Sequence, residues 1–216
     1  ISSVDYRYTL VDTTPPVAPK LVTSAAFHYL ADPQVTIQTS MGTVVVELHP
    51  EQAPVTVANM LAYIDGDFYD STLFHRVIEG FMVQGGGFNS GLVYKSPTYA
   101  AISLESNNGL TNMRGTIAMA RTNDPNSATS QFFINQVDNS FLNYSNAASP
   151  GYAVFGHVLS GLSVIDSIAQ VYTDSSDAPL AEVTITSINQ TGAGSGISNA
   201  NTLLVSDLEA GATWSY

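Results

Sequence analysis

The sequence contains no cysteine, which excludes disulfide bonds, thiolate nucleophiles and cysteine-based zinc sites. It also lacks the Gly-x-Ser-x-Gly turn that presents the nucleophilic serine of many hydrolases. The run Gly85-Gly86-Gly87 is not followed by Gly-Lys-Ser/Thr, so it does not have the pattern of a phosphate-binding loop. Hydrolases and nucleotide-dependent enzymes are therefore poorly supported.

Charged residues are scarce, at 11% of the chain against roughly 25% in an average domain. The few that are present are mainly acidic, with 6 Lys+Arg against 18 Asp+Glu and a net charge of −12. Nucleic acids and anionic membranes repel such a surface, so neither is expected as a partner. No apolar run approaches the ~18 residues of a membrane span, and we expect no membrane insertion.

The chain has four histidines, His28, His49, His75 and His157. Their spacing matches no metal-ligand motif, so the sequence predicts no metal and no cofactor. A weak Ca²⁺ site between Asp174 and Asp177 is an open alternative. A solvated loop is favoured there, because two carboxylates and two serines supply too few ligands without help from other segments.

Composition divides the chain into three parts: 1–33, 34–190 and 191–216. The first contains a Pro-rich stretch typical of a stiff spacer, and the last begins with a Gly/Ser-rich linker followed by strand-like segments. Two interpretations of these irregular extensions stay open. They are the end and the start of neighbouring domains in a longer multidomain chain, or they are frayed extensions of the central domain.

Within residues 34–190, apolar patterns predict eight short strands and two helices. The predicted strands are Val35–Thr39, Thr43–Leu48, Phe74–Val77, Met82–Gly85, Thr116–Ala120, Gln131–Ile134, Val154–Val158 and Val183–Ile188. One helix opens at Pro54 and ends at Gly66, and the other covers about Leu162–Val171. Many short strands with few helices favour a mainly β fold, a closed barrel with helical caps, over a βαβ sheet.

Arg76 and Gln84 are polar residues inside apolar strand patterns, in Phe-His-Arg-Val-Ile-Glu-Gly-Phe-Met-Val-Gln-Gly-Gly at 74–86. Taken alone, each could be an ordinary surface or core residue. Two further strings follow in order, Ser-Gln-Phe-Phe-Ile at 130–134 and Tyr-Ala-Val-Phe-Gly-His-Val at 152–158. Together the three resemble the signatures of the cyclophilin family of peptidyl-prolyl isomerases, and the resemblance runs from about Val35 to Ile188.

The resemblance implies an eight-stranded antiparallel β-barrel capped by two α-helices, acting on X–Pro bonds of proline-containing polypeptides and assisting folding. Arg76 takes the position of the catalytic arginine. Gln84 and Gln131 would bond the substrate backbone, and Ala120 and Arg121 would line the neighbouring groove. The predicted substrate-binding residues are Phe81, Met82, Gln84, Ala120, Arg121, Gln131, Phe133, Phe141, Leu142 and Tyr152. Among these, Phe81, Met82, Phe133 and Leu142 would form the proline pocket.

The chain departs from the eukaryotic pattern of the family at Phe141, where a Trp stands, and at Tyr152, where a His stands. The form Met-Ala-Arg-Thr at 119–122 and Tyr152 resemble the bacterial branch. Without the indole N–H at position 141, we expect weak cyclosporin binding. We also expect an exported bacterial protein, periplasmic, secreted or surface-attached, with a cytoplasmic location left open.

The predicted residue types fit a reaction that makes and breaks no bond. Rotation about X–Pro must overcome a barrier of roughly 18–20 kcal/mol set by amide resonance. A guanidinium such as that of Arg76 bonds the lone pair that the prolyl nitrogen regains on twisting. His75 is expected to be structural and to face away from Arg76. The rival hypothesis is a proline-binding or purely structural module.

Overall fold

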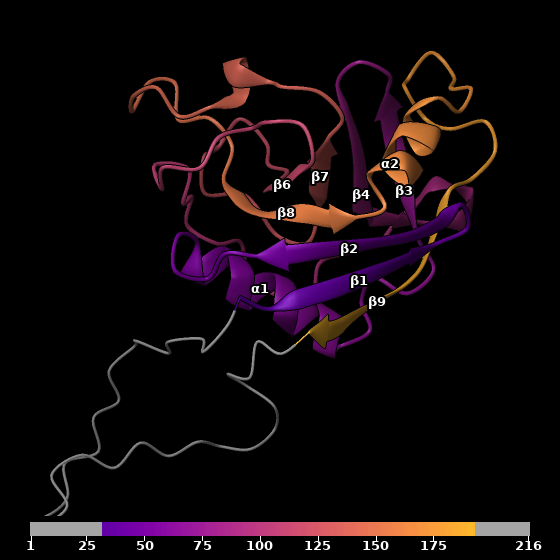
Figure 1. Ribbon diagram of the computed structural model, residues 1–216, viewed down its shortest axis with the longest axis horizontal. Helices are drawn as coiled ribbons and strands as arrows, with labels where there is room; N and C mark the ends of the chain where they lie inside the picture. The colour runs from indigo at the N-terminus through magenta and orange to yellow at the C-terminus, as the bar shows by residue number, and fades with distance from the viewer. Residues whose placement is uncertain (1–31, 193–216) are drawn as a thin grey trace, which may run out of the picture. The chain divides into compact units, whose positions relative to one another are not determined.

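The computed structural model describes residues 32–192. The predictions for the Pro-rich N-terminal stretch and the Gly/Ser-rich C-terminal stretch lie outside the described residues. The described strands are β1 Gln34–Thr39, β2 Gly42–Leu48, β3 Thr72–Ile78, β4 Met82–Asn89, β5 Val93–Tyr94, β6 Thr116–Met119, β7 Phe132–Asn135, β8 Val154–Ser160 and β9 Thr184–Gly192. The helices are α1 Pro54–Asp65 and α2 Leu162–Ala169, with 3₁₀ turns at Ser90–Leu92 and Ser140–Leu142 (Figure 1).

Eight of the strands close into an antiparallel barrel, as predicted. Their order around the wall is β3-β9-β1-β2-β8-β6-β7-β4, and a β3–β4 pairing closes the ring. The short β5, which the sequence did not predict, extends the sheet by pairing with β4 alone. Closure leaves the eight barrel strands with no free edge to pair with another chain.

Alternation along the strands fills the interior. In the β1–β2 hairpin, Val35 is paired with Val46 and Ile37 with Val44, and all four side chains are fully buried in the barrel core. Gly42 has a φ of 137°, a conformation that side chains rarely adopt, so glycine is needed where the predicted turn joins these strands. The pattern that predicted the hairpin is thus the pattern that fills the core.

The two helices pack on the barrel through their predicted apolar faces; in Figure 1, α1 lies at the lower left, partly behind β1, and α2 lies at the upper right. Pro54 occupies the first turn of α1 and Gly66 follows its last residue. Helix α2 buries Ile165 and Ile168 but ends at Ala169, two residues before the predicted end. Within the described residues, no helix is both long enough and apolar enough to cross a membrane.

The N-terminus of α1 is capped by a distant side chain. Ala53, the residue before the helix, makes no side-chain cap. Instead the Glu105 carboxylate accepts hydrogen bonds from the backbone N–H groups of Val55 (3.1 Å) and Thr56 (2.8 Å) and from the Thr56 hydroxyl (2.7 Å). A carboxylate at this end also interacts favourably with the helix dipole. Glu105 therefore fixes its own loop to the start of α1.

We expect Glu105→Ala to lower the free energy of unfolding by about 1–2 kcal/mol, the usual loss for a removed helix cap. Urea denaturation of the variant and the parent protein measures the difference. Glu79→Ala is the matched control, because Glu79 is an exposed acid that no helix end uses. Equal losses for the two variants would contradict the capping role.

Candidate functional site

One row of residues crosses five neighbouring strands on the outside of the barrel. Arg76 on β3 is opposite Gln84 on β4, and Gln84 is opposite Phe133 on β7. Phe133 is opposite Ala118 on β6, which in turn is opposite Val154 on β8. Directly opposed residues in a sheet place their side chains on the same face. The register therefore brings a charge, an amide and three apolar side chains into one line.

A β-bulge in β3 accommodates Arg76 on this face. Phe74 pairs with Gly85 and Arg76 with Gln84, so His75 is an additional residue on β3. As a result Phe74 and Val77, three residues apart, both face the barrel core. Bulges of this kind often redirect a side chain next to a functional site. His75 was expected to face away from Arg76 because side chains alternate along a regular strand. That alternation is interrupted by the bulge.

The apolar part of the site is separate from the barrel core. We call it the outer apolar cluster: buried Met82, Ala118, Phe133 and Val154, with partly buried Ile78, Phe81, Leu110, Ala120, Leu142 and Tyr152. Six of these ten were predicted as substrate-binding residues. Ala118 and Val154 were missed, although strand alternation points to them. Leu110 lies in a loop where no periodic pattern could have indicated it.

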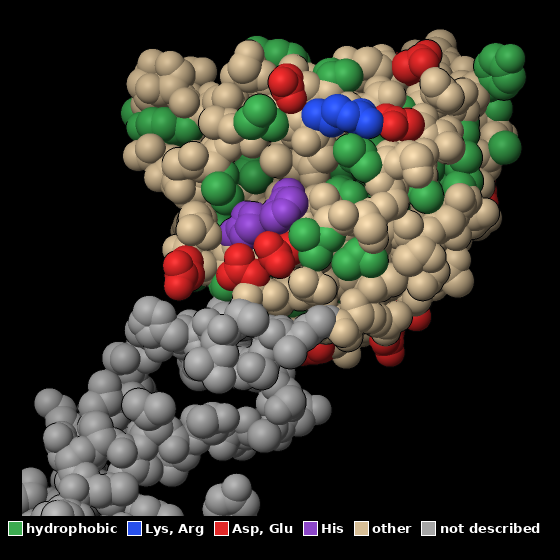
Figure 2. Space-filling view, viewed as in Figure 1, with side chains coloured by type: hydrophobic (Ala, Val, Ile, Leu, Met, Phe, Trp, Pro, Cys, Tyr) green, Lys and Arg blue, Asp and Glu red, His purple; other side chains and the backbone are tan. Residues whose placement is uncertain are grey.

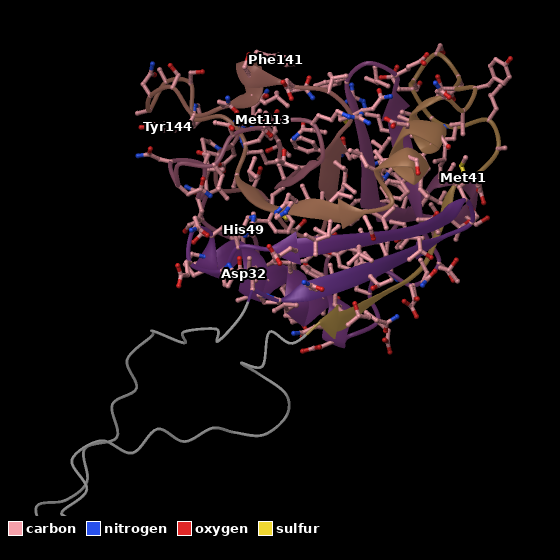
Figure 3. All side chains as sticks on the ribbon, viewed as in Figure 1. Asp32, Met41, His49, Met113, Phe141 and Tyr144 are labelled. Carbon is pink, nitrogen blue, oxygen red and sulfur yellow. The ribbon has the colours of Figure 1, made fainter. Side chains whose placement is uncertain are left out.

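Phe141 lies at the margin of the outer apolar cluster. Its ring stacks on Phe81, with centroids 5.6 Å apart, yet 72% of the residue is exposed. Figure 3 shows it on the 3₁₀ turn at the top of the molecule. The neighbouring Leu142 is held in the cluster because its carbonyl accepts a hydrogen bond from the Tyr152 N–H at 2.9 Å.

The Arg76 guanidinium is oriented by Asp177. Its Nε donates to the Asp177 carboxylate at 3.3 Å, and the Asp177 carbonyl accepts from the Val77 N–H at 2.8 Å. Both side chains are about two-fifths exposed, at 42% and 41%, so the ion pair contributes little to stability. Among the described residues, the terminal nitrogens of Arg76 make no hydrogen bond. The pair therefore holds the guanidinium at one edge and leaves the other free.

The loop that carries Asp177 uses its carboxylates internally. Asp174 accepts hydrogen bonds from the backbone N–H groups of Ser176 (2.7 Å) and Ala178 (3.0 Å). Asp177 is engaged by Arg76. Within residues 32–192, these two acids are not part of any group of three or more candidate metal ligands.

Gln84 and Gln131 form an amide pair beside Arg76. The Gln84 Nε2 donates to the Gln131 Oε1 at 2.9 Å, and the Gln131 carbonyl accepts from the Ala120 N–H at 3.0 Å. A side chain at Gly87 would place its Cβ 2.4 Å from the Gln131 amide. The last residue of the glycine run therefore provides the space that Gln131 occupies.

Arg121 packs against Tyr152 in the outer apolar cluster. Its guanidinium donates to the Gly151 carbonyl (3.0 and 2.8 Å) and to the Thr122 carbonyl (2.8 Å). It also lies 4.5 Å from the centroid of the Tyr152 ring, which meets Phe133 edge-on. The cation–π contact and the three hydrogen bonds fix a second positive charge at the edge of the cluster.

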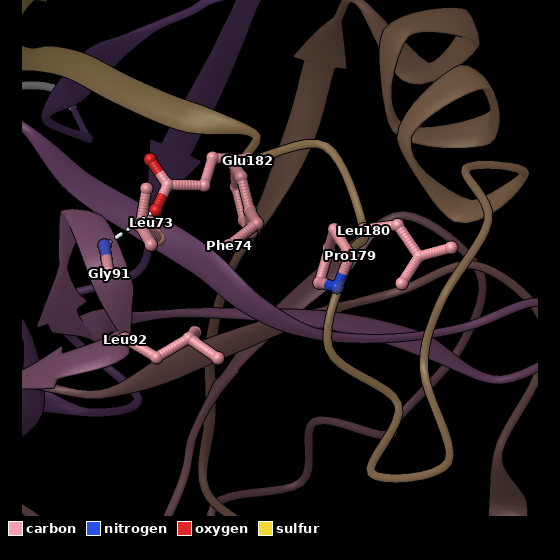
Figure 4. Close-up of a pocket in the computed structure, with 7 residues that line it drawn as sticks. All are labelled: Leu73, Phe74, Gly91, Leu92, Pro179, Leu180 and Glu182. Atoms are coloured by element: carbon pink, nitrogen blue, oxygen red, sulfur yellow. Dashed lines mark hydrogen bonds between the residues drawn. The ribbon is translucent and has the colours of Figure 1, made fainter.

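A hollow of about 270 Å³ lies elsewhere on the surface (Figure 4). It is lined by Leu73, Phe74, Gly91, Leu92, Pro179, Leu180 and Glu182. Glu182 accepts a hydrogen bond from the Gly91 N–H across it. None of the predicted site residues lines this hollow, so we place the candidate site at the cross-strand row and the outer apolar cluster.

Comparison with known proteins identifies the family. Residues 34–190 match the family described as cyclophilin type peptidyl-prolyl cis-trans isomerase/CLD. The chain belongs to the cyclophilins. It is accordingly a peptidyl-prolyl cis-trans isomerase, and both the family and the activity predicted from the motifs are confirmed.

Bacterial cyclophilins are among its curated relatives. Peptidyl-prolyl cis-trans isomerase B of Escherichia coli is 49% identical, over 71% of this chain and 97% of its own. An isomerase of Streptomyces antibioticus is 52% identical, over 71% and 95%. A cyclophilin-type isomerase of Cryptosporidium parvum, solved in the presence of the dipeptide Ala-Pro, superposes with a TM-score of 0.65 at 30% identity and covers 74% of this chain and 99% of its own. The prediction of the bacterial branch is confirmed.

His75 is a partly buried titratable group next to Arg76 on β3. It packs on Phe88, with ring centroids 4.5 Å apart, and its Nδ1 is buried without a hydrogen bond of normal geometry. Burial is the largest effect and lowers the pKa of His75 to about 4, against weaker opposing effects of the Leu73 backbone and the Gln131 side chain. The imidazole is therefore neutral at physiological pH and does not supply charge to the site.

This depressed pKa predicts a pH-dependent stability. The unfolded chain binds a proton at His75 near the ordinary pKa of about 6.5, whereas the folded cyclophilin resists it until about pH 4. The contribution of neutral His75 to the free energy of unfolding is complete above pH 6.5. As the pH falls from about 6.5 to about 4, the free energy of unfolding decreases by up to about 1.4 kcal/mol per pH unit. Urea unfolding at pH 7.0, 5.5 and 4.5 should give a shallower pH dependence for His75→Gln than for the parent. Parallel curves would show that His75 is not responsible.

Proposed function

We propose that Arg76 is the group through which this cyclophilin accelerates rotation about X–Pro bonds. The observation that carries the proposal is the cross-strand row, in which Arg76 and Gln84 adjoin the apolar Phe133 on one face. Twisting the C–N bond makes the prolyl nitrogen pyramidal and restores its lone pair. A guanidinium aimed at that nitrogen bonds the twisted amide better than either planar form, which is the condition for catalysis.

The outer apolar cluster is proposed to receive the proline ring. Met82 and Phe133 are buried at its floor, and Phe81 and Leu142 are only partly buried, so their free surface is available to a ligand. Twisting reduces the charge separation of the amide, and an apolar surface favours the less polar state. The proline ring would be held while the residue before it turns.

The amide pair is proposed to hold the substrate backbone. Gln84 and Gln131 are already fixed to each other at 2.9 Å, and the main chain at Ala120 is anchored to Gln131. When one side of the X–Pro bond is held fixed, binding energy positions the substrate for rotation of the other side and so lowers the barrier. Arg121 and Tyr152 are proposed to line the groove beside the proline site, where they would influence which neighbouring residues fit.

The energy required is compatible with these few groups. Lowering the barrier by about 7 kcal/mol corresponds to an acceleration of about 10⁵. A charged hydrogen bond in an environment with little water, added to positioning, supplies a large part of such a change. No general base or covalent intermediate is needed. Asp177 contributes as a positioning residue, because it holds Arg76 through Nε and leaves the terminal nitrogens free.

We expect Arg76→Ala to lower kcat/KM on a Pro-containing peptide by about 10²–10³, the range for loss of a group that stabilises the transition state. A protease-coupled assay, or NMR exchange measured on the peptide itself, gives the rate. The control is Glu79→Gln, which changes an exposed acid on the neighbouring β3–β4 turn.

Arg76→Ala should unfold at nearly the parent's denaturant midpoint, since the Asp177 pair is exposed. A rate unchanged by this substitution would reject Arg76 as the catalytic group. A parent protein that binds the peptide but gives no rate gain over buffer would favour the rival, a proline-binding module.

Weak cyclosporin binding is proposed because the exposed Phe141 has no N–H to donate. We expect Phe141→Trp to tighten binding by up to about tenfold, since one hydrogen bond adds about 0.5–1.5 kcal/mol. Isothermal titration of both proteins with cyclosporin measures this, with Phe141→Leu as a variant that adds no donor. Equal affinities of the Trp and Leu variants for cyclosporin would show that the missing N–H donor at position 141 is not the cause of weak binding. Export and a multidomain context stay predictions from sequence.

A further inference from the structure

A second group of polar side chains lies on the barrel wall, on β8 and the adjoining end of β2. Glu47, His49 and His157 each offer one ligand atom, and these atoms all lie within 4.8 Å of one another. All three residues are partly buried, so the group is accessible from solvent. Figure 2 shows the histidines side by side on the surface with acidic side chains directly beneath them.

The sheet register produces this cluster. Glu47 on β2 is directly opposite His157 on β8, so their side chains share a face. His49 follows two residues after Glu47 and lies on the same side. Its backbone N–H donates to the Phe155 carbonyl at 2.8 Å, which fixes its position against β8. The three ligand groups are therefore held by paired strands, which is favourable for a preorganised site.

Asp32 determines which nitrogen of His49 is free. The Asp32 carboxylate lies 2.9 Å from His49 Nδ1, so this nitrogen carries the hydrogen and donates it. The lone pair is left on Nε2, which points at His157 Nδ1 at 3.0 Å. Figure 3 shows Asp32 next to His49. A carboxylate that orients a histidine in this way is a recurrent partner of metal-binding histidines.

We propose that Glu47, His49 and His157 bind a divalent transition-metal ion, with Asp32 orienting His49. Two imidazole nitrogens and one carboxylate are the donor set preferred by Zn²⁺, Ni²⁺ and Cu²⁺ over the hard ions Ca²⁺ and Mg²⁺. The net charge of −12 also favours binding of cations in general. Because the three residues are only partly buried, water could supply the remaining ligands.

The nitrogen separation favours an ion that accepts right angles. Two nitrogens each about 2.1 Å from an ion subtend about 90° when 3.0 Å apart, whereas a tetrahedral angle needs a separation of about 3.4 Å. Ni²⁺ and Cu²⁺ adopt such tetragonal arrangements. Zn²⁺ would need the two rings to separate by a few tenths of an ångström, so we expect it to bind more weakly than Ni²⁺.

One contact competes directly with a metal ion: the hydrogen bond between His49 Nε2 and His157 Nδ1 at 3.0 Å, which an ion would have to replace. Apart from the two histidines, the Glu47 carboxylate meets the Gln34 amide at 3.4 Å, near the limit of a hydrogen bond. The histidines also stack, with ring centroids 5.0 Å apart. The alternative is a purely structural Asp32–His49–His157 hydrogen-bond chain, which would need no carboxylate at position 47.

The test is isothermal titration of the untagged 216-residue chain with Ni²⁺ and Zn²⁺, and with Ca²⁺ as a hard-ion comparison. We expect saturable one-to-one binding of Ni²⁺, weaker binding of Zn²⁺ and none of Ca²⁺. His157→Gln should weaken Ni²⁺ binding by more than about 100-fold, and Asp32→Asn by about 10–100-fold. Asp65→Asn, an exposed acid at the end of α1, should leave it unchanged.

A second measurement locates the ion without any substitution. Ni²⁺ is paramagnetic in octahedral coordination and should broaden the backbone amide signals of Glu47, His49 and His157 before those around Arg76. Absence of saturable Ni²⁺ binding would overturn the proposal. So would equal affinities of the parent and His157→Gln, a Glu47→Gln variant that binds as tightly as the parent, or broadening centred elsewhere in the chain.

Discussion

Closure of the sheet is the constraint on which the rest of this molecule depends. Strand β3 pairs with β9 on one side and with β4 on the other, so the wall has a single inside and a single outside. Residues that face inward must be apolar and well packed, and those that face outward are released from that requirement. Strand β3 meets both requirements because it carries a bulge at His75. The bulge lets Arg76 face outward while Phe74 and Val77 both face the core.

The consequence is two apolar regions on opposite sides of the same backbone. Val83 belongs to the barrel core, whereas its neighbours Met82 and Gln84 belong to the site. The outer apolar cluster can therefore be adapted to different ligands with little effect on interior packing. Its polar margin is fixed by contacts that come from elsewhere in the chain: Asp177 for Arg76, and the Gly151 carbonyl for Arg121.

Much of this arrangement was predictable from local patterns. Alternation predicted the strands, and helical spacing predicted both helices. Three ordered motifs predicted the family, and the resemblance to it indicated six of the ten residues of the outer apolar cluster. Long-range contacts were not predictable in the same way. Glu105 reaches α1 from a loop 49 residues away from Thr56, and His49 meets His157 across 108 residues, so no sequence spacing indicated either. The bulge was missed because a pattern of period two assumes regular pairing.

The Gly87–Gln131 contact changes how the glycine run should be understood. Gly87 does not have a positive φ, so its backbone conformation would accept a side chain. What it lacks is room, because the Gln131 amide fills the volume that a methyl group would take. The absence of a side chain at Gly87 therefore leaves the space that the Gln131 amide occupies, and a larger residue at this position would displace Gln131 from its 2.9 Å contact with Gln84.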